Sequence, residues 1–261
     1  MKIAAVIEYR GSRYSGWQHQ QHATSIQQLV EAALARVADH EVRVHCAGRT
    51  DTGVHALNQV IHFETNSVRP VNAWVAGSNT YLSDDISLLW AQPIADDFHA
   101  RYSALRRSYR YIILNRPMRP GLICDLVAWE HRPLDVNLMH RAASDLIGEH
   151  DFSSYRAAGC QAKVPVREVQ KLEVFRSGEY VVIEITANAF LQHMVRNIAG
   201  VLMAIGSGKQ DIDWARQILD ARDRTKGGVT APANGLYLTR VEYPEAYGIP
   251  EPATGSWPLI L

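Results

Sequence analysis

Residues 24–37 read TSIQQLVEAALARV, and this stretch gives the clearest element of secondary structure in the chain. Its apolar residues recur at helical spacing, which gives the segment one apolar face: Ile26, Leu29, Val30, Ala33, Leu34 and Val37. Thr24 and Gln27 have the spacing of a capping box, which predicts that the helix begins there. An apolar, β-rich segment over residues 2–9 precedes the helix and predicts a buried strand.

The segments that follow complete a pattern and then repeat it. In the first half, strands are predicted over 41–47, 57–65 and 86–94, and a helix over 70–81. In the second half, strands are predicted over 106–115, 167–175, 179–188 and 235–243, and helices over 135–148, 190–205 and 213–222. Each half therefore has the order β-α-β-β-α-β, apart from one extra helix in the second.

This repeat predicts an α+β fold made of two ferredoxin-like halves that share a continuous antiparallel sheet with helices on one face. We expect the first half to span residues 1–104 and the second 105–245. Residues 246–261 contain several prolines and are expected to form a surface tail.

The composition is that of an ordinary globular protein, and it argues against a strongly basic, a disulfide-rich or a membrane-spanning protein. The chain of 261 residues balances 27 basic against 27 acidic residues, so a polyanion can be bound only through local segregation of charge. Its three cysteines have neither metal-type spacing nor an even number for disulfides, which suits a reducing cytoplasm. No apolar run is long enough to span a membrane. We therefore expect a cytoplasmic protein without a metal or cofactor.

The stretch AGRTDTGVHA, residues 47–56, is the first candidate for a functional site. It holds one carboxylate, Asp51, and one cation, Arg49, in a run of small residues that contains two glycines. A neighbouring cation favours the ionised form of a carboxylate, and an ionised, partly desolvated carboxylate on a loop is a candidate nucleophile. The alternative is a solvated turn in which the aspartate bonds only to its own backbone.

The segment from residue 101 to 120 is rich in arginine and contains neither Asp nor Glu. Its arginines are Arg101, Arg106, Arg107, Arg110, Arg116 and Arg119, and its tyrosines are Tyr102, Tyr109 and Tyr111. Guanidinium groups bind phosphates and tyrosine rings stack on bases, so this composition is typical of single-stranded RNA binding. A charged strand edge with buried tyrosines is the alternative interpretation.

A third stretch, residues 190–198 (FLQHMVRNI), is predicted to be helical and mostly apolar. Arg196 lies on its polar face, and a cation in such a place needs a partner. Asp51 is our candidate for that partner; another acid or backbone carbonyl groups are the alternatives.

Five stretches together resemble the tRNA pseudouridine synthase A family. They are Tyr9–Gln20 (YRGSRYSGWQHQ), Ala47–Ala56 (AGRTDTGVHA), Phe98–Tyr111 (FHARYSALRRSYRY), Phe190–Gly200 (FLQHMVRNIAG) and Thr230–Leu238 (TAPANGLYL). The resemblance implies two ferredoxin-like halves, a homodimer, no cofactor, and isomerisation of uridines 38, 39 and 40 in the tRNA anticodon stem-loop.

The resemblance also implies a role for individual residues. Asp51 corresponds to the family's nucleophilic aspartate, and Tyr109 to the tyrosine that stacks on the target uracil. Arg49 corresponds to the arginine that assists in flipping the nucleotide, Arg196 to the arginine that pairs with the aspartate, and Leu236 to the leucine that lines the base pocket. The RNA phosphates would then be held by Arg13, Arg101, Arg107 and Arg110.

The sequence departs from the family's pattern at two places. Arg10 stands where the family often has Asp, and Gly227-Gly228 stand where other small residues are usual. Both lie outside the nucleophile loop, so they concern local contacts rather than the chemistry.

Two other functions each match one part of the sequence. Asp51-Thr52-Gly53 spells the signature of aspartic proteases, but the residues before it are not an apolar strand and the chain has no second such triplet. A non-catalytic RNA-binding module would need the arginine-rich segment but not Asp51.

Overall fold

The computed structural model describes residues 1–252, which form two compact units. The first unit comprises Met1–Leu105 and the described chain from Tyr237 onward, and the second comprises Arg106–Leu236. The last strand, which the sequence pattern assigns to the second half, therefore belongs to the first unit. Of the predicted Pro-rich tail, residues 253–261 lie outside the described part of the chain.

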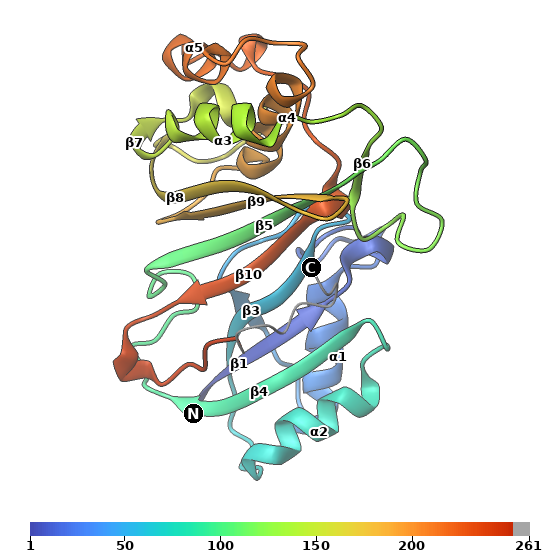
Figure 1. The fold of residues 1–261 in the computed structure, drawn as a ribbon. Helices are drawn as coiled ribbons and strands as arrows, with labels where there is room; N and C mark the ends of the chain where they lie inside the picture. Colours follow the sequence, from blue (N-terminus) through green and yellow to red (C-terminus); the bar gives the residue numbers. More distant parts are fainter. Residues whose placement is uncertain (253–261) are drawn as a thin grey trace. The chain divides into compact units, whose positions relative to one another are not determined.

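The first unit is a sheet with two helices (Figure 1). Its elements are β1 (Lys2–Tyr9), α1 (Ile26–Ala38), β2 (Val44–Cys46), β3 (His55–Glu64), α2 (Val71–Tyr81), β4 (Ile86–Ile94) and β10 (Leu236–Glu242). The antiparallel order β4-β1-β3-β2 is that of a ferredoxin-like unit. β10 pairs with the start of β3 in parallel, so the sheet is not antiparallel throughout as predicted.

Helix α1 follows the predicted pattern but begins at a different residue. Ile26, Val30 and Leu34 are fully buried, as the helical spacing requires. The N-cap is Ser25, whose side chain accepts a hydrogen bond from the backbone N–H of Gln28. The predicted capping box of Thr24 and Gln27 is thus wrong by one residue, because the Gln27 amide instead donates to Glu31 and to a backbone carbonyl of β2.

Apart from the last strand, the second unit contains the elements predicted for the second half, and it has two more strands. Its elements are β5 (Arg106–Asn115), β6 (Ala128–Glu130), α3 (Val136–Ser144), β7 (Gly148–Asp151), β8 (Val166–Ser177), β9 (Tyr180–Ala187), α4 (Met194–Gly206) and α5 (Trp214–Ala221). The order β5-β9-β8-β7 is antiparallel, and β6 adds to β5 in parallel. β6 and β7 have three and four residues, too few for a periodic pattern to be recognised.

The two helices α3 and α4 differ from prediction at one end each. Asp135 caps α3 as expected, by accepting a hydrogen bond from the backbone N–H of Leu138, but the helix ends at Ser144 and the predicted stop, Gly148, begins β7. α4 begins at Met194 rather than near residue 190, because His193 has a left-handed backbone with φ of 62°. Both units contain helices and a mostly antiparallel sheet, so the predicted α+β class is confirmed.

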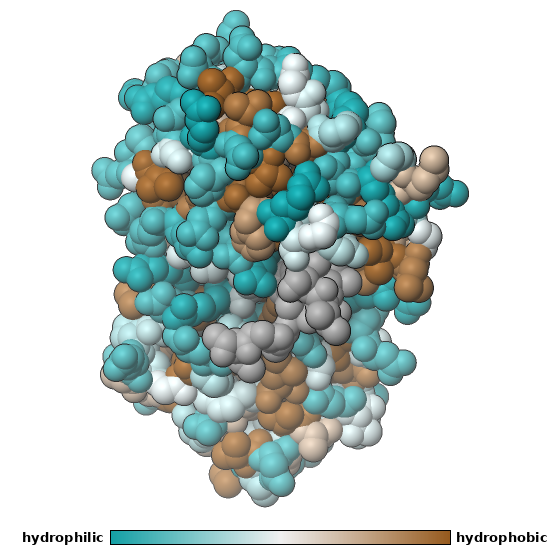
Figure 2. Space-filling model, viewed as in Figure 1, coloured by the Kyte–Doolittle hydropathy of each residue, from teal (hydrophilic) through white to brown (hydrophobic). Residues whose placement is uncertain are grey.

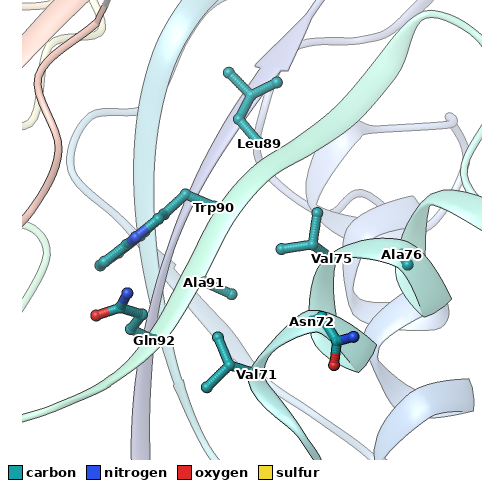
Figure 3. Close-up of a pocket in the computed structure, with 8 residues that line it drawn as sticks. All are labelled: Val71, Asn72, Val75, Ala76, Leu89, Trp90, Ala91 and Gln92. Atoms are coloured by element: carbon teal, nitrogen blue, oxygen red, sulfur yellow. The ribbon is translucent and has the colours of Figure 1, made fainter.

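The face drawn in Figure 2 is mainly hydrophilic, and its hydrophobic residues form small patches. An open groove of about 580 Å³ lies between α2 and β4 and is lined by side chains that include Val71, Val75 and Leu89 (Figure 3). No residue of this groove belongs to the predicted site. Within residues 1–252, no helix combines the length and apolar character that crossing a bilayer requires.

Candidate active site

The segment between β2 and β3 carries Asp51 at a tight turn. The Ala47 N–H donates to the Val60 carbonyl at 2.8 Å, which ties the start of the segment to β3. The Val54 N–H donates to the carbonyl of Asp51 at 3.1 Å and closes the turn, and Gly53 inside it has a φ of 80°. A residue with a side chain adopts that backbone conformation at a cost, so this glycine is required by the turn.

Side chains from β1 and β3 hold the same loop from both sides. The Tyr9 hydroxyl is hydrogen-bonded to the Thr50 hydroxyl at 2.8 Å, and both residues are buried. The Gln59 side chain binds Gly48 twice: its amide donates to the Gly48 carbonyl at 2.6 Å, and its oxygen accepts from the Gly48 N–H at 3.3 Å. Thr50, the residue before Asp51, is therefore fixed by a buried side-chain bond.

The segment after β1 packs so closely on the loop that it needs glycine at two positions. A Cβ on Gly11 would lie 1.9 Å from the Val54 carbonyl oxygen, which is far inside contact distance. Gly16 has a φ of +82°, and a Cβ there would lie 2.7 Å from the Thr50 carbonyl oxygen. The next residue, Trp17, donates its N–H to that same carbonyl at 2.9 Å. The loop is thus a fixed support for the residue at its tip.

Asp51 is half-buried at that tip, and Arg49 is exposed two residues earlier. Cys46, which precedes the loop, is not a second nucleophile. Burial raises the pKa of its thiol to about 12, even though the charges of Arg49 and Arg101 act in the opposite direction. A thiol with so high a pKa stays protonated and unreactive near neutral pH.

Strand β5 of the second unit carries Tyr109. Burial alternates along this strand as predicted, with Arg107, Tyr109 and Tyr111 buried and Ser108 and Arg110 half-buried between them. The Phe190 ring meets the Tyr109 ring edge-on, with centroids 5.0 Å apart, and so holds it in one orientation.

The arginines of the 101–120 segment have partners that the sequence argument did not foresee. Arg110 forms a salt bridge to Glu184 of β9 at 2.5 Å, and Arg116 one to Glu179 at 3.1 Å. Arg107 is buried and donates to the Asn188 carbonyl at 3.0 Å. The absence of acids from the segment therefore does not mean that its cations lack counter-charges, and the predicted phosphate contacts of Arg107 and Arg110 stay predictions.

Helix α4 positions Arg196 against the chain that leads to β10. The Nε of Arg196 donates to the Ala231 carbonyl at 2.8 Å, and the Ala231 N–H donates to the Arg196 carbonyl at 3.1 Å. One turn further along, a Cβ on Gly200 would lie 1.9 Å from the Val229 carbonyl oxygen. A backbone carbonyl is thus one partner of Arg196, as the alternative interpretation expected, and the pairing with Asp51 stays a prediction.

The remaining predicted residues are divided between the two units. Arg13 and Arg101 belong to the first unit and are exposed, although Arg13 has Asp85 at 4.0 Å. Leu236 is buried in the second unit at the start of β10. The first unit therefore carries Asp51, Arg49, Arg13 and Arg101, and the second carries Tyr109, Arg107, Arg110, Arg196 and Leu236.

The two departures from the family's pattern have local surroundings that the structure describes. The backbone N–H of Arg10 donates to the Asp85 carbonyl at 2.9 Å. A Cβ on Gly227 would lie 2.9 Å from the Ser154 carbonyl oxygen, and one on Gly228 would lie 3.1 Å from the ring of Trp214. Tight packing therefore accounts for the two glycines.

Sequence reasoning missed the residues that hold the loop, among them Tyr9, Gly16 and Gln59. Tyr9 and Gly16 lie in one of the stretches on which the family resemblance rests, but nothing in their spacing predicts contact with a loop more than thirty positions later.

Within residues 1–252, no group of three His, Cys, Asp or Glu side chains is placed to hold a metal ion.

Known proteins match this chain over most of its length. The model of a family described as tRNA pseudouridine synthase matches residues 5–103 and 142–244. The tRNA pseudouridine synthase A of Hydrogenovibrio crunogenus is 53% identical over 95% of this chain and 95% of its own. That of Coxiella burnetii (strain Dugway 5J108-111) is 54% identical over 98% of each chain, and that of Legionella pneumophila (strain Corby) is 53% identical over 95% of each. A solved Cbf5-Nop10-Gar1 complex is more distant, with 11% identity, a TM-score of 0.36, and coverage of 91% of this chain and 58% of that one.

Proposed function

Because the chain belongs to the tRNA pseudouridine synthase family, we propose that it isomerises uridines 38, 39 and 40 of the tRNA anticodon stem-loop to pseudouridine. Asp51 acts on a uridine that has been flipped out of its stack. The observation that carries this proposal is the loop itself, which presents one half-buried carboxylate on a support fixed by Tyr9, Gln59 and Trp17. A fixed support keeps a reacting group within the narrow range of positions that catalysis requires.

The reaction is an isomerisation that neither gains nor loses atoms. The bond between C1′ and N1 breaks, the uracil rotates, C5 joins C1′, and the C5 proton leaves while N1 gains one. Three roles are open to the Asp51 carboxylate: attack on C1′ as in a retaining glycosidase, addition to C6, or removal of the C2′ proton. Each of them needs an ionised carboxylate and none needs a metal ion.

Tyr109 would compensate for the unstacking of the target base. Flipping a nucleotide costs a few kcal/mol, and stacking on an aromatic ring returns about 1–3 kcal/mol. The edge contact with Phe190 supports this role, because a ring already held in place loses little entropy when a base stacks on it. Leu236 would line the apolar side of the same pocket.

The arginines would bind negatively charged groups, namely the Asp51 carboxylate and the RNA phosphates. Arg196 would pair with Asp51 through guanidinium N–H groups other than Nε, which binds the Ala231 carbonyl. Arg49 would assist the flipping of the nucleotide. Among the proposed phosphate contacts, the exposure of Arg13 and Arg101 supports their part most directly. We further propose that the protein acts as a homodimer in the cytoplasm, where tRNA is its partner.

The test is to map pseudouridine in unmodified tRNA after incubation with the protein, position by position. We expect modification at 38, 39 and 40 with the wild type and none with Asp51→Asn, whose tRNA affinity stays near that of the wild type. Asp84→Asn, the same substitution at an exposed aspartate of the first unit, is the matched control and should leave the activity unchanged. If the wild type binds tRNA but forms no pseudouridine, the chain is a binding module; if Asp51→Asn keeps activity, Asp51 is not the nucleophile.

A further inference from the structure

Three histidine rings of the first unit form a cluster that the proposed reaction does not use. His45 of β2 and His62 of β3 are cross-strand neighbours, so both side chains lie on the same face of the sheet. Their rings are stacked with centroids 4.9 Å apart, and His99, from the segment after β4, lies 4.6 Å from His62 and 5.4 Å from His45. The Tyr102 ring extends the cluster, with its centroid 4.4 Å from that of His99.

Backbone hydrogen bonds fix the orientation of two of these rings. The Nδ1 of His62 accepts from the Ala100 N–H at 3.1 Å, and the Nδ1 of His99 accepts from the Arg101 N–H at 3.1 Å. A ring nitrogen that accepts a hydrogen bond carries no proton, so each of these imidazoles is neutral. Burial is the largest cause that lowers the pKa of both groups, that of His62 to about 3, and the neighbouring histidine rings and Lys2 act in the same direction.

The cluster runs from the buried ring of His62 to the exposed ring of Tyr102, which a cation partly covers. His62 is 4% exposed, whereas Tyr102 is 76% exposed. The Arg101 guanidinium lies over the Tyr102 ring, 5.6 Å from its centre. His45 lies in β2, the strand that leads directly into the loop that carries Asp51, so the cluster is close to that loop in the chain.

We propose that Tyr102, backed by His99 and His45, is a stacking site for an unpaired nucleobase of the bound RNA, separate from the base that reaches Asp51. The inference rests on the proposed function for the identity of the RNA. Tyrosine and histidine rings are faces on which splayed-out bases stack, and an adjacent arginine can hold the phosphate of the same nucleotide. Because the rings are already ordered, binding a base costs them little conformational entropy.

The experiment measures RNA affinity with the intact chain, using a hairpin with an unpaired loop and a fully paired duplex of equal length. The Tyr102→Leu variant loses one base–aromatic stack, so it should bind the hairpin about 5- to 150-fold more weakly than the wild type. Tyr102→Phe keeps the ring and should bind like the wild type. The control is Tyr81→Leu at another exposed tyrosine of the first unit, which should leave the affinity unchanged. Duplex binding should be the same in all four proteins.

Single abasic positions in the hairpin loop then locate the base. One of them should weaken wild-type binding as much as Tyr102→Leu does, and the two changes combined should show no further loss. The stacking site is refuted if Tyr102→Leu binds the hairpin within about twofold of the wild type, or if duplex binding falls equally. Affinity is independent of turnover, so a wild type that forms no pseudouridine would refute the proposed function and leave this result standing.

Discussion

The buried His62 should make the stability of the first unit depend on pH. Its ring is 4% exposed and lies between His45 and His99, and it accepts a hydrogen bond from the Ala100 N–H. These surroundings lower its pKa from 6.5 to about 3, chiefly because burial disfavours the charged imidazolium. We propose to measure this effect by comparing the wild type with His62→Gln, which keeps an acceptor oxygen but does not titrate.

The sign follows from the number of protons bound in each state. Between pH 6.5 and pH 3 the unfolded chain has a protonated His62 and the folded chain does not, so the unfolded state binds one more proton. Unfolding therefore becomes easier as the pH falls through this window. The free energy of unfolding should drop by up to about 1.4 kcal/mol per pH unit from this group, which amounts to roughly 2 kcal/mol between about pH 6.5 and about pH 4.5.

Urea unfolding of both proteins at several pH values gives the measurement. His62→Gln loses ring contacts and should be less stable than the wild type near neutral pH, and the difference should shrink by up to about 1.4 kcal/mol for each pH unit below 6.5. Tyr243→Phe is the control, because it removes a hydrogen bond from the Tyr243 hydroxyl to the Ala100 carbonyl, at 2.5 Å, without removing a group that titrates in this range. The difference in free energy of unfolding between Tyr243→Phe and the wild type should therefore be constant over the same pH range. A difference for His62→Gln that stays constant within about 0.5 kcal/mol over the window would refute the buried, neutral state of the ring.

Three further outcomes are expected. Gly11→Ala places a Cβ against the Val54 carbonyl, so it should lower the free energy of unfolding in urea by about 1–3 kcal/mol and abolish most of the activity. Gly121→Ala, whose Cβ would lie in open space, should change neither the stability nor the activity. Tyr9→Phe leaves the buried hydroxyl of Thr50 without its partner and should cost about 1–3 kcal/mol, part of which Thr50→Val added to it should restore. In a pseudouridine assay, turnover should fall far less for Tyr109→Phe than for Tyr109→Leu, because stacking needs the ring and not the hydroxyl; equal losses would point to proton transfer.

Much of the fold could be predicted because its strands and helices are regular in sequence. β1, β4 and β5 have the predicted bounds, since apolar residues or residues with high β-propensity run through each and turns delimit them. The start of α4 could not be predicted, because the apolar pattern from residue 190 continues through the left-handed backbone of His193 without a visible break. A single positive φ at a non-glycine residue is a tertiary effect that local propensity does not indicate.

Charge was the least predictable property of the site. The composition of the arginine-rich segment contains no acid, but strand pairing places Arg110 opposite Glu184, seventy-four positions later in the chain. The same pairing logic places His45 opposite His62 and brings together histidine rings that are far apart in the sequence. Cross-strand neighbours depend on register, and register depends on the whole sheet, so a local reading of charge overestimates the number of cations available to RNA.

The loop at Asp51 could be found from its sequence, but the reason it is a rigid site could not. The hydroxyl of Tyr9, the N–H of Trp17 and the amide of Gln59 hold the loop in place, and none of these residues belongs to its ten positions. These contacts bind backbone or Thr50 rather than the carboxylate, so they position Asp51 without consuming its charge. It follows that substitutions in residues 9–17 that break these contacts should reduce turnover although the Asp51 side chain itself is unchanged. A second substitution should recover the lost turnover only if it brings the loop back to its original position.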